Sequence, residues 1–264
     1  MSETAATGQA ATQKHRTGYY IYAIAPADVA TTAEARGVGD PPAGVEVIAH
    51  DDIAALVSEI PADHALGTPD DFAAHARLVD AAAQEVPILP LRFGAVLPDR
   101  EAVTEELLAA NHDEFADALQ HLDGRAEFIV KGRYDEQAIL REVLAENRTA
   151  EQLRAAIAGA PEDATRNERI QLGELMTQAV AAKREQDTAA LVKALAPLGY
   201  DGVIREPTHE RDAVYVAYLV DTDGRDRFRE TVEDWAERQR GRIDVRLLGP
   251  VAAYDFVGTA QPGS

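Results

Sequence analysis

The chain has no cysteine among its 264 residues. This absence excludes disulfide bonds, cysteine nucleophiles and thiolate zinc sites, and it is typical of a cytoplasmic protein. Long apolar runs are missing too, because the 46% of residues that are hydrophobic never form a stretch able to span a bilayer. Residues 1–17 are small and polar and lack the apolar core of a signal peptide. We therefore expect a disordered N-terminal tail there, and a flexible tail at 259–264.

Basic residues are scarce. The chain carries 26 Lys and Arg against 46 Asp and Glu, a net charge of −20. Nucleic acids and anionic membrane surfaces are bound largely through Lys and Arg, so this balance argues against both as partners. The first 134 residues carry 9 basic and 22 acidic side chains, and the remainder carries 17 and 24, so the acidity is spread along the chain. We interpret it as a solubility feature.

Motifs of catalysis and of cofactor or metal binding are also lacking. No histidine pair has a helical zinc spacing, and there is no phosphate-binding loop or nucleophile elbow. Asp221-Thr222-Asp223-Gly224 has its glycine too early for a calcium loop and is better explained as a turn. We therefore expect no catalytic residue, no metal and no cofactor. One alternative stays open, a small-molecule pocket formed around His50, His64 and His75.

The first half of the chain alternates β-branched runs with amphipathic helices. We predict strands at 19–25, 45–49, 53–59 and 126–133, and helices at 68–84 and 99–122. The first helix has an apolar stripe of Phe72, Ala76, Val79 and Ala83, and the second has one of Val103, Leu107, Phe115, Leu119 and Leu122. This order predicts an α+β domain of ferredoxin-like type over 18–134, with both helices on one face of the sheet.

The second half begins with a helical section, 135–198, broken near Gly159-Ala160-Pro161 and at Pro197. We interpret it as a linker, with an antiparallel pair packed on one domain as the alternative. Strands are then predicted at 202–205, 213–220, 243–248 and 251–257, and a helix at 224–240 with Phe228, Val232 and Trp235 facing inward. The fold class is therefore α+β, with a second, modified ferredoxin-like sandwich over 199–258 joined to the first by the helical section.

Two short segments are the most distinctive. Residues 86–94 read Val-Pro-Ile-Leu-Pro-Leu-Arg-Phe-Gly, an apolar run interrupted twice by proline. Because proline lacks the N–H that a sheet requires, this run predicts an edge strand or a rigid extended connection. Residues 126–131, Ala-Glu-Phe-Ile-Val-Lys, form a short apolar strand between charges.

In this order the segments resemble the gas vesicle protein GvpL/GvpF family, in which an aromatic first strand, here Tyr19–Ile24, precedes a Pro-Leu-Arg-Phe-Gly segment and a Glu-x-x-x-Lys strand. The end of the chain is similar as well, with Gly249-Pro250 followed by Tyr254-Asp255-Phe256. The chain departs from the family pattern at Val251-Ala252-Ala253, where a tryptophan and prolines are expected.

The resemblance implies a non-enzymatic, cytoplasmic protein located at gas vesicles. It implies a minor structural or assembly component that binds the major shell protein and other gas vesicle accessory proteins. The alternative is an assembly chaperone that is absent from the finished vesicle. The motif positions that become candidate partner contacts are Pro87, Pro90, Arg92, Phe93, Gly94, Glu127, Lys131, Gly249, Pro250, Tyr254 and Phe256.

Four of these positions have a structural interpretation that competes with partner binding. Arg92 and Glu127 are expected either to contact a partner or to pair with each other. Tyr254 and Phe256 alternate on the last predicted strand, so burial in the second sandwich is expected for both.

Overall fold

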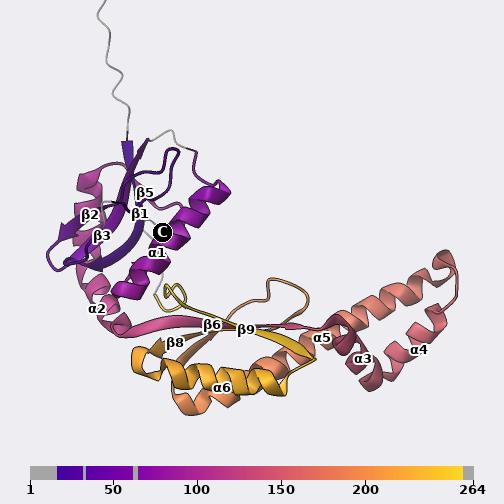
Figure 1. Ribbon diagram of the computed structural model, residues 1–264. Coiled ribbons are helices and arrows are strands. Elements are labelled where there is room, and N and C mark those ends of the chain that lie inside the picture. Colours follow the sequence, from indigo (N-terminus) through magenta and orange to yellow (C-terminus); the bar gives the residue numbers. More distant parts are fainter. Residues whose placement is uncertain (1–16, 32–33, 62–64, 258–264) are drawn as a thin grey trace, which may run out of the picture. The chain divides into compact units, whose positions relative to one another are not determined.

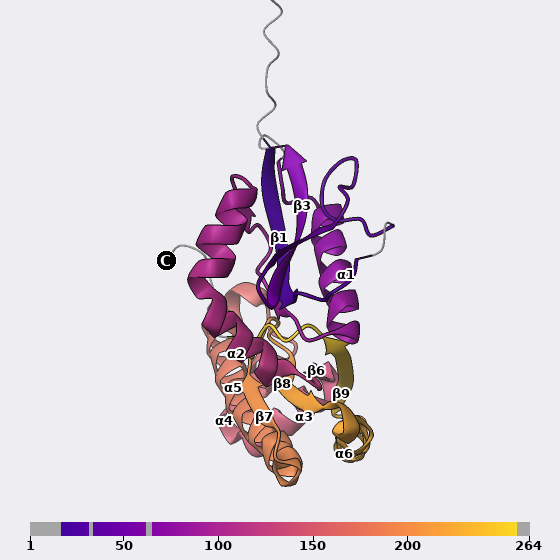
Figure 2. The same ribbon diagram turned by 90° about the vertical axis from the view of Figure 1, so that its left-hand side faces the viewer.

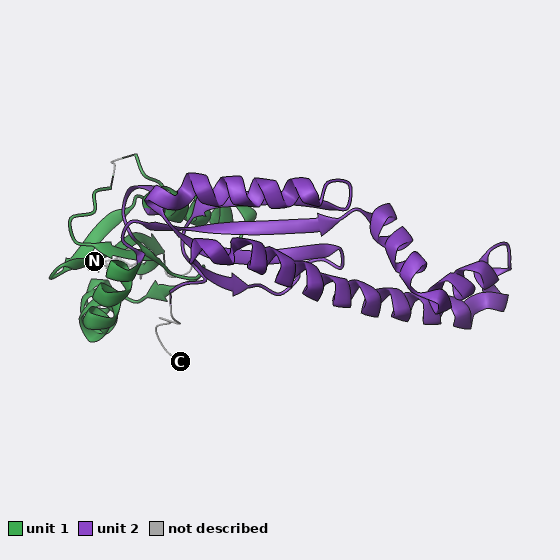
Figure 3. Cartoon of the chain, turned by 90° about the horizontal axis from the view of Figure 1, so that it is seen from below, with its two compact units in different colours: residues 1–82, 88–121, 259–264 green, residues 83–87, 122–258 purple. Residues whose placement is uncertain are grey.

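The computed structural model describes residues 17–31, 34–61 and 65–257. The tails expected at 1–17 and 259–264 lie outside these residues, except that Thr17 already begins the first strand. The chain divides into two compact units (Figure 3). The described parts of Met1–Ala82 and Ile88–His121 belong to the first unit, and those of Ala83–Pro87 and Leu122–Gly258 belong to the second.

The first unit is built on an antiparallel sheet. Its strands are β1 (Thr17–Pro26), β2 (Glu46–His50), β3 (Ile53–Pro61), β4 (Leu89–Pro90) and β5 (Val96–Leu97). They lie in the order β2-β3-β1-β4, and β5 also pairs with β1. The hairpin predicted between β2 and β3 is confirmed, with Asp51 in the left-handed region at φ 51°. Both β4 and β5 contain only two residues, so this edge of the sheet is thinly covered.

The helices of the first unit lie on opposite sides of the sheet (Figure 2). They are α1 (Pro69–Glu85) and a continuous helical stretch made of a π-helix at Ala102–Leu108, a 3₁₀ turn at Ala109–Asn111 and α2 (His112–Leu122). The prediction that both helices share one face is wrong. Residues 20–25 of β1 are buried on both faces, and a strand that is apolar on both faces needs cover on each side.

The apolar stripe predicted for α1 is wrong at two of its four positions, Phe72 and Ala76, while Val79 is buried and Ala83 half-buried. Phe72 is 52% exposed and Ala76 is exposed, whereas Asp71, Ala74, His75 and Val79 are buried. The helix is turned because the Asp71 carboxylate accepts hydrogen bonds from Gly39, Gly67 and Thr68 at 2.8–3.2 Å. Burial opposes the charge on Asp71, but these hydrogen bonds outweigh it and lower its pKa to about 2. The five apolar positions predicted for the second helix are buried, as expected.

The second unit has its own antiparallel sheet, formed by β6 (Arg125–Tyr134), β7 (Asp201–Ile204), β8 (Asp212–Asp221) and β9 (Ile243–Val251). The helices of this unit are α3 (Glu136–Glu146), α4 (Arg148–Ile157), α5 (Arg166–Leu195) and α6 (Arg225–Arg238). The strands lie in the order β7-β8-β6-β9. A β-α-β-β-α-β chain with this strand order is ferredoxin-like.

The domain boundary therefore differs from the prediction. The strand expected to close the first domain, 126–133, is the central strand β6 of the second sheet, paired with β8 on one side and β9 on the other. The helical section 135–198 is the crossover from β6 to β7 within the second unit, and the second sandwich begins at β6 instead of 199. The physical reason is that β8 and β9 do not pair with each other, so a sheet made only of residues 199–258 would lack its centre.

The last predicted strand, 251–257, is also wrong. The strand β9 extends to Val251, with an irregularity in its pairing with β6 at Gly249 and Pro250. Residues 252–257 then form a turn in which the Tyr254 N–H donates to the carbonyl of Ala252 at 2.9 Å. As a result Tyr254 is 37% exposed instead of buried in a sandwich core, and Phe256 is half-buried.

The core of the second unit lies between its sheet and the helices α5 and α6 (Figure 1). The sheet contributes side chains such as Phe128, Val130 and Tyr218, and α5 contributes Leu191 and Leu195. From α6 come Phe228, Val232 and Trp235, which confirms the inward face predicted for that helix.

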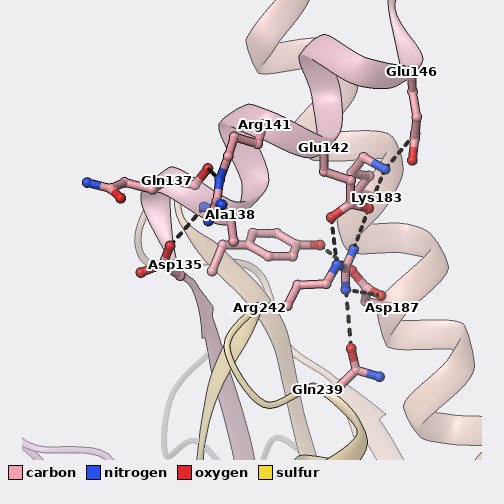
Figure 4. Close-up of polar contacts among 11 residues, drawn as sticks. Asp135, Gln137, Ala138, Arg141, Glu142, Glu146, Lys183, Asp187, Gln239 and Arg242 are labelled. Carbon is pink, nitrogen blue, oxygen red and sulfur yellow. Dashed lines mark hydrogen bonds and ion pairs between the residues drawn. The ribbon is translucent and has the colours of Figure 1, made fainter.

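A network of charged side chains holds the crossover helices in place (Figure 4). The Arg242 guanidinium, just before β9, donates to Glu142 on α3 at 2.7 Å and to Asp187 on α5 at 2.9 Å. Lys183 on α5 donates to Glu142 at 2.6 Å and to Glu146 at 2.7 Å. These bonds join α3 and α5 to the start of β9, so the helices are part of the second unit.

Candidate functional site

The candidate contact residues fall into two separate groups. Pro90, Arg92, Phe93 and Gly94 belong to the first unit, and Pro87 is half-buried between α1 and β4. The second unit contains Pro87 and six others, which are Glu127, Lys131, Gly249, Pro250, Tyr254 and Phe256.

The proline-interrupted segment is an edge of the first sheet, as predicted. Only Leu89 and Pro90 pair with β1, after which the Leu91 N–H donates to the Tyr22 carbonyl at 2.9 Å. The chain then leaves the sheet at Arg92 and returns through Gly94, whose φ of 97° is readily adopted by glycine. This connection carries Arg92 and Phe93 out to the surface side of the edge.

Phe93 anchors an aromatic cluster on the α1 side of the sheet. Its ring centroid lies 5.8 Å from that of Tyr20, 5.7 Å from His75 and 4.0 Å from Phe72, with which it is stacked. Tyr20 and His75 are buried and share a 2.9 Å hydrogen bond. Burial lowers the pKa of His75, so this histidine is neutral at pH 7.

The outer part of this cluster is an apolar surface. Phe72 is 52% exposed, Val96 is 42% exposed, and Arg92 is exposed next to Phe93. Val96 pairs directly with Tyr20, which places both side chains on one face of the sheet. We call Phe72, Arg92, Phe93 and Val96 the Phe72 patch. A charged or aromatic side chain beside exposed apolar groups is typical of a protein-binding surface.

The histidine pocket considered as an alternative is not supported by the described residues. His75 belongs to the aromatic cluster, whereas the His50 ring lies 6.2 Å from that of His112 and 3.6 Å from Asp51. His64 is outside the described residues. Within residues 17–31, 34–61 and 65–257, no group of three or more His, Asp or Glu side chains could hold a metal ion.

The motif residues of the second unit meet around Glu127, at one end of the second sheet. The Glu127 carboxyl is fully buried on β6 and accepts from Arg205 at 3.1 Å and from the Asp255 N–H at 3.1 Å. Arg205 also donates to the Asp255 carboxylate at 2.7 Å and to the Tyr215 hydroxyl at 2.8 Å. We call Glu127, Arg205, Tyr215 and Asp255 the Glu127 cluster.

The Glu127 cluster corrects the expected Arg92–Glu127 pair. The guanidinium that contacts Glu127 is that of Arg205, which follows β7, whereas Arg92 lies in the first unit. Gly249 is part of the same arrangement, because a Cβ built on it would lie 2.8 Å from the Glu127 carbonyl oxygen. Gly249 and Pro250 thus let β9 pass close to Glu127, and the turn that follows brings Asp255 back to it.

One cation faces two carboxyl groups in this cluster. The pKa of Glu127 is raised to about 8: burial raises it most and the nearby Asp255 carboxylate also raises it, while the Asp255 N–H and Arg205 act in the opposite direction. The positive charge of Arg205 balances only one carboxylate, so the second carboxyl keeps its proton near neutral pH.

This arrangement predicts a specific pH dependence. The pKa of Glu127 is higher in the folded state than its ordinary 4.5. The contribution of this carboxyl group to folding stability is therefore fully present below pH 4.5 and is lost as the pH rises through about 8. Between pH 5 and pH 9 we expect wild type to lose roughly 2–4 kcal/mol of unfolding free energy relative to Glu127→Gln, which cannot ionise. Urea unfolding of both proteins across this range tests it. If the unfolding free energies of the two proteins changed with pH in parallel, the raised pKa of Glu127 would be contradicted.

Lys131 lies on the same face of the sheet as Glu127, four residues further along β6. Its ammonium group is 4.2 Å from the centroid of the Tyr215 ring and donates to the Thr208 hydroxyl at 2.7 Å. It also lies 3.7 Å from Asp212, which is buried. Lys131 therefore secures the loop before β8, a structural role that its position in the motif did not reveal.

Sequence analysis missed Arg205, Tyr215 and Asp255. Asp255 lies within the Tyr-Asp-Phe motif, and its charge between two aromatic residues is the sequence feature that could have indicated its role. Arg205 and Tyr215 carry no local signal, because their roles depend on the pairing of β7, β8 and β6.

The sequence and the fold can be compared with those of known proteins. The family model described as gas vesicle synthesis protein GvpL/GvpF matches residues 18–258. Gas vesicle protein F of Streptomyces sp. (strain CB03234) is 30% identical over 239 residues, covering 90% of this chain and 98% of the relative. Gas vesicle protein L of the same strain is 27% identical over 271 residues, 92% and 93% of the two chains.

Solved structures share the fold. The crystal structure of GvpF from Anabaena sp. PCC7120 superposes with a TM-score of 0.75 at 22% identity, covering 94% of this chain and 99% of that one. The GvpF structure from Microcystis aeruginosa gives a TM-score of 0.72 over 91% of this chain.

The chain is thus a gas vesicle protein with an α+β fold of two antiparallel sheets. It belongs to the GvpL/GvpF family. Among the residues that the structure describes, no helix is both long enough and apolar enough to span a membrane.

Proposed function

We propose that this chain is a non-enzymatic, minor structural or assembly component of cytoplasmic gas vesicles that binds the major shell protein. Membership of the GvpL/GvpF family supports the general role. The observation that supports a binding site is the Phe72 patch, where the exposed Phe72 stacks on the half-buried Phe93 beside a thinly covered sheet edge. A shell protein that is strongly apolar would aggregate if left free, so an acidic partner with such a patch would keep it in solution.

The edge itself suits this role. Because β4 and β5 are two residues long and separated by the Arg92–Ala95 connection, an extended apolar segment could add beside them while its side chains contact Phe72 and Phe93. Other gas vesicle accessory proteins are further partners under this proposal.

Replacing Phe72 by alanine tests the site. Phe72 lies on the surface of α1, so Phe72→Ala is expected to weaken binding of the major shell protein about tenfold or more while leaving the fold intact. Arg92→Ala should act in the same direction. The measurement is co-expression with the shell protein, affinity capture and quantification of the captured shell protein, with circular dichroism to check folding.

The matched control is Ile170→Ala, since Ile170 on α5 has the same 52% exposure as Phe72. Phe93 is a poorer choice for the test because its ring packs on Tyr20 and His75, and its loss would lower stability as well. If folded Phe72→Ala and Arg92→Ala proteins capture as much shell protein as wild type, the proposed site is wrong.

The assembly chaperone remains the second candidate, since an exposed patch serves a transient complex equally well. Floating intact vesicles and washing them stringently separates the two roles. Retention of this chain in the washed vesicles identifies a structural component, and its complete loss identifies a chaperone.

A further inference from the structure

The two edges of the second sheet differ in how they are protected. The strand β9 exposes the charged side chains Asp244 and Arg246, which discourage pairing with another strand. The strand β7 exposes one charged residue, Asp201, at its start, followed by Gly202 and Ile204, and Ile204 is 64% exposed. Among the residues that the structure describes, β7 pairs only with β8, so its outer edge is open.

The hydrogen-bonding pattern shows which groups point outward from β7. The Arg205 N–H donates to the Tyr215 carbonyl at 2.8 Å, so residues 205, 203 and 201 direct their backbone groups toward β8. Residues 202 and 204 therefore present their N–H and C=O groups to the open edge. Two donors and two acceptors are available there.

We propose that a second copy of this chain occupies this edge, with the two β7 strands paired antiparallel about a two-fold axis at Val203. In this register Gly202 lies opposite the partner's Ile204, and Asp201 lies opposite the partner's Arg205. The Gly202–Ile204 pairs each exchange two backbone hydrogen bonds, four in all. Val203 faces its own copy between them, as the alternation of an antiparallel ladder requires.

The sequence Asp201-Gly202-Val203-Ile204-Arg205 is complementary to itself when reversed, which is why the occupant is a second copy. In this register each Ile204 side chain lies opposite a glycine, Gly202, and each Asp201 lies opposite Arg205, so both pairings occur twice across the two-fold axis. Arg205 already contacts Asp255 and Glu127, and its side chain stays 22% exposed. It is thus accessible to a further carboxylate.

Apolar burial adds to the pairing. Ile204, Ala189 and Val192 line a groove of about 740 Å³ between α5 and β7, and Val192 is 38% exposed. Gly202 and Ile204 lie on the helix side of the sheet, since they pair with the core residues Tyr218 and Val216. Pairing therefore brings both Ile204 side chains to the edge of this groove. The contact is short, so the dimer is a weak one.

Sedimentation velocity of the full chain over a range of concentrations tests the dimer. Wild type is expected to associate reversibly, and Ile204→Lys is expected to weaken association about tenfold or more because it places a charge at the edge. The control is Leu248→Lys, which changes an aliphatic residue that is 47% exposed on the opposite edge strand. A monomeric wild type at about 1 mM, or equal weakening by both variants, would overturn the proposal.

The lack of cysteine allows a second, independent measurement. In Val203→Cys the introduced thiols of two copies face each other at the two-fold axis, so mild oxidation is expected to yield a disulfide-linked dimer. Leu248→Cys is the control and should cross-link far less. Equal cross-linking of the two folded variants would rule out the β7 register. The experiment uses no shell protein, so its outcome is separate from that of the proposed function.

Discussion

Replacing Arg205 by leucine is expected to destabilise the second unit by about 3–5 kcal/mol. The guanidinium of Arg205 is the cation that faces the buried Glu127 and Asp255 carboxyl groups, and it also donates to the Tyr215 hydroxyl. Its loss leaves the half-buried Asp255 carboxylate beside the buried Glu127 without a cation, and it frees the turn at residues 252–257 from β7. Urea unfolding at pH 7 measures the change.

The control for this prediction is Arg246→Leu. Arg246 lies on the edge strand of the same sheet, and its pairing with Asp244 at 3.4 Å joins two largely exposed side chains. Such pairs contribute about 0–1 kcal/mol, so little change is expected. Adding Glu127→Gln to Arg205→Leu should restore part of the lost stability, because a glutamine, unlike Glu127, does not have to take up a proton when the chain folds at pH 7. If the two arginine variants were equally stable, the Glu127 cluster would not be a centre of stability.

Replacing Gly249 by alanine is expected to cost about 3 kcal/mol or more. Gly249 has a φ of 127°, a conformation that residues with a Cβ rarely adopt. The added Cβ would also lie 2.8 Å from the Glu127 carbonyl oxygen and 2.9 Å from the Phe128 ring. Since both neighbours belong to the central strand β6, they cannot move without disturbing the sheet. Thermal and urea unfolding measure the loss.

Gly173→Ala provides a control of opposite sign. Gly173 lies within α5, and a Cβ built there meets nothing within 4 Å. Alanine is the better helix former, so a gain of roughly 0.5–1 kcal/mol is expected. A Gly249→Ala protein as stable as wild type would show that β9 can shift away from Glu127.

Local patterns predicted most of the elements. The hairpin at 46–61, the inward face of α6 and the breaks in the helical section all follow from side-chain periodicity and from turn residues, which act over a few positions. The resemblance to the GvpL/GvpF family also came from short motifs, and the family comparison confirms it. What these patterns did not reveal is which sheet a strand joins.

The strand β6 is the clearest case. Its sequence, apolar and flanked by charges, suits either sheet, and the order of elements along the chain predicts that it closes the first. Its place was decided by β8 and β9, which lie about 80 and 120 residues further along and both pair with it. The outward turn of Phe72 has a similar origin, because Asp71 is held by Gly39, far away in the sequence.

The sequence by itself determined the class of the elements, the absence of cysteine chemistry, the acidic character and the family. Only the tertiary structure decided that Glu127 is balanced by Arg205, that Phe72 and Phe93 form a surface patch, and that β7 leaves an open edge. The reason is physical. Helix and strand formation depend on neighbouring residues, whereas charge pairing, burial and sheet edges depend on long-range strand order, which no local pattern records.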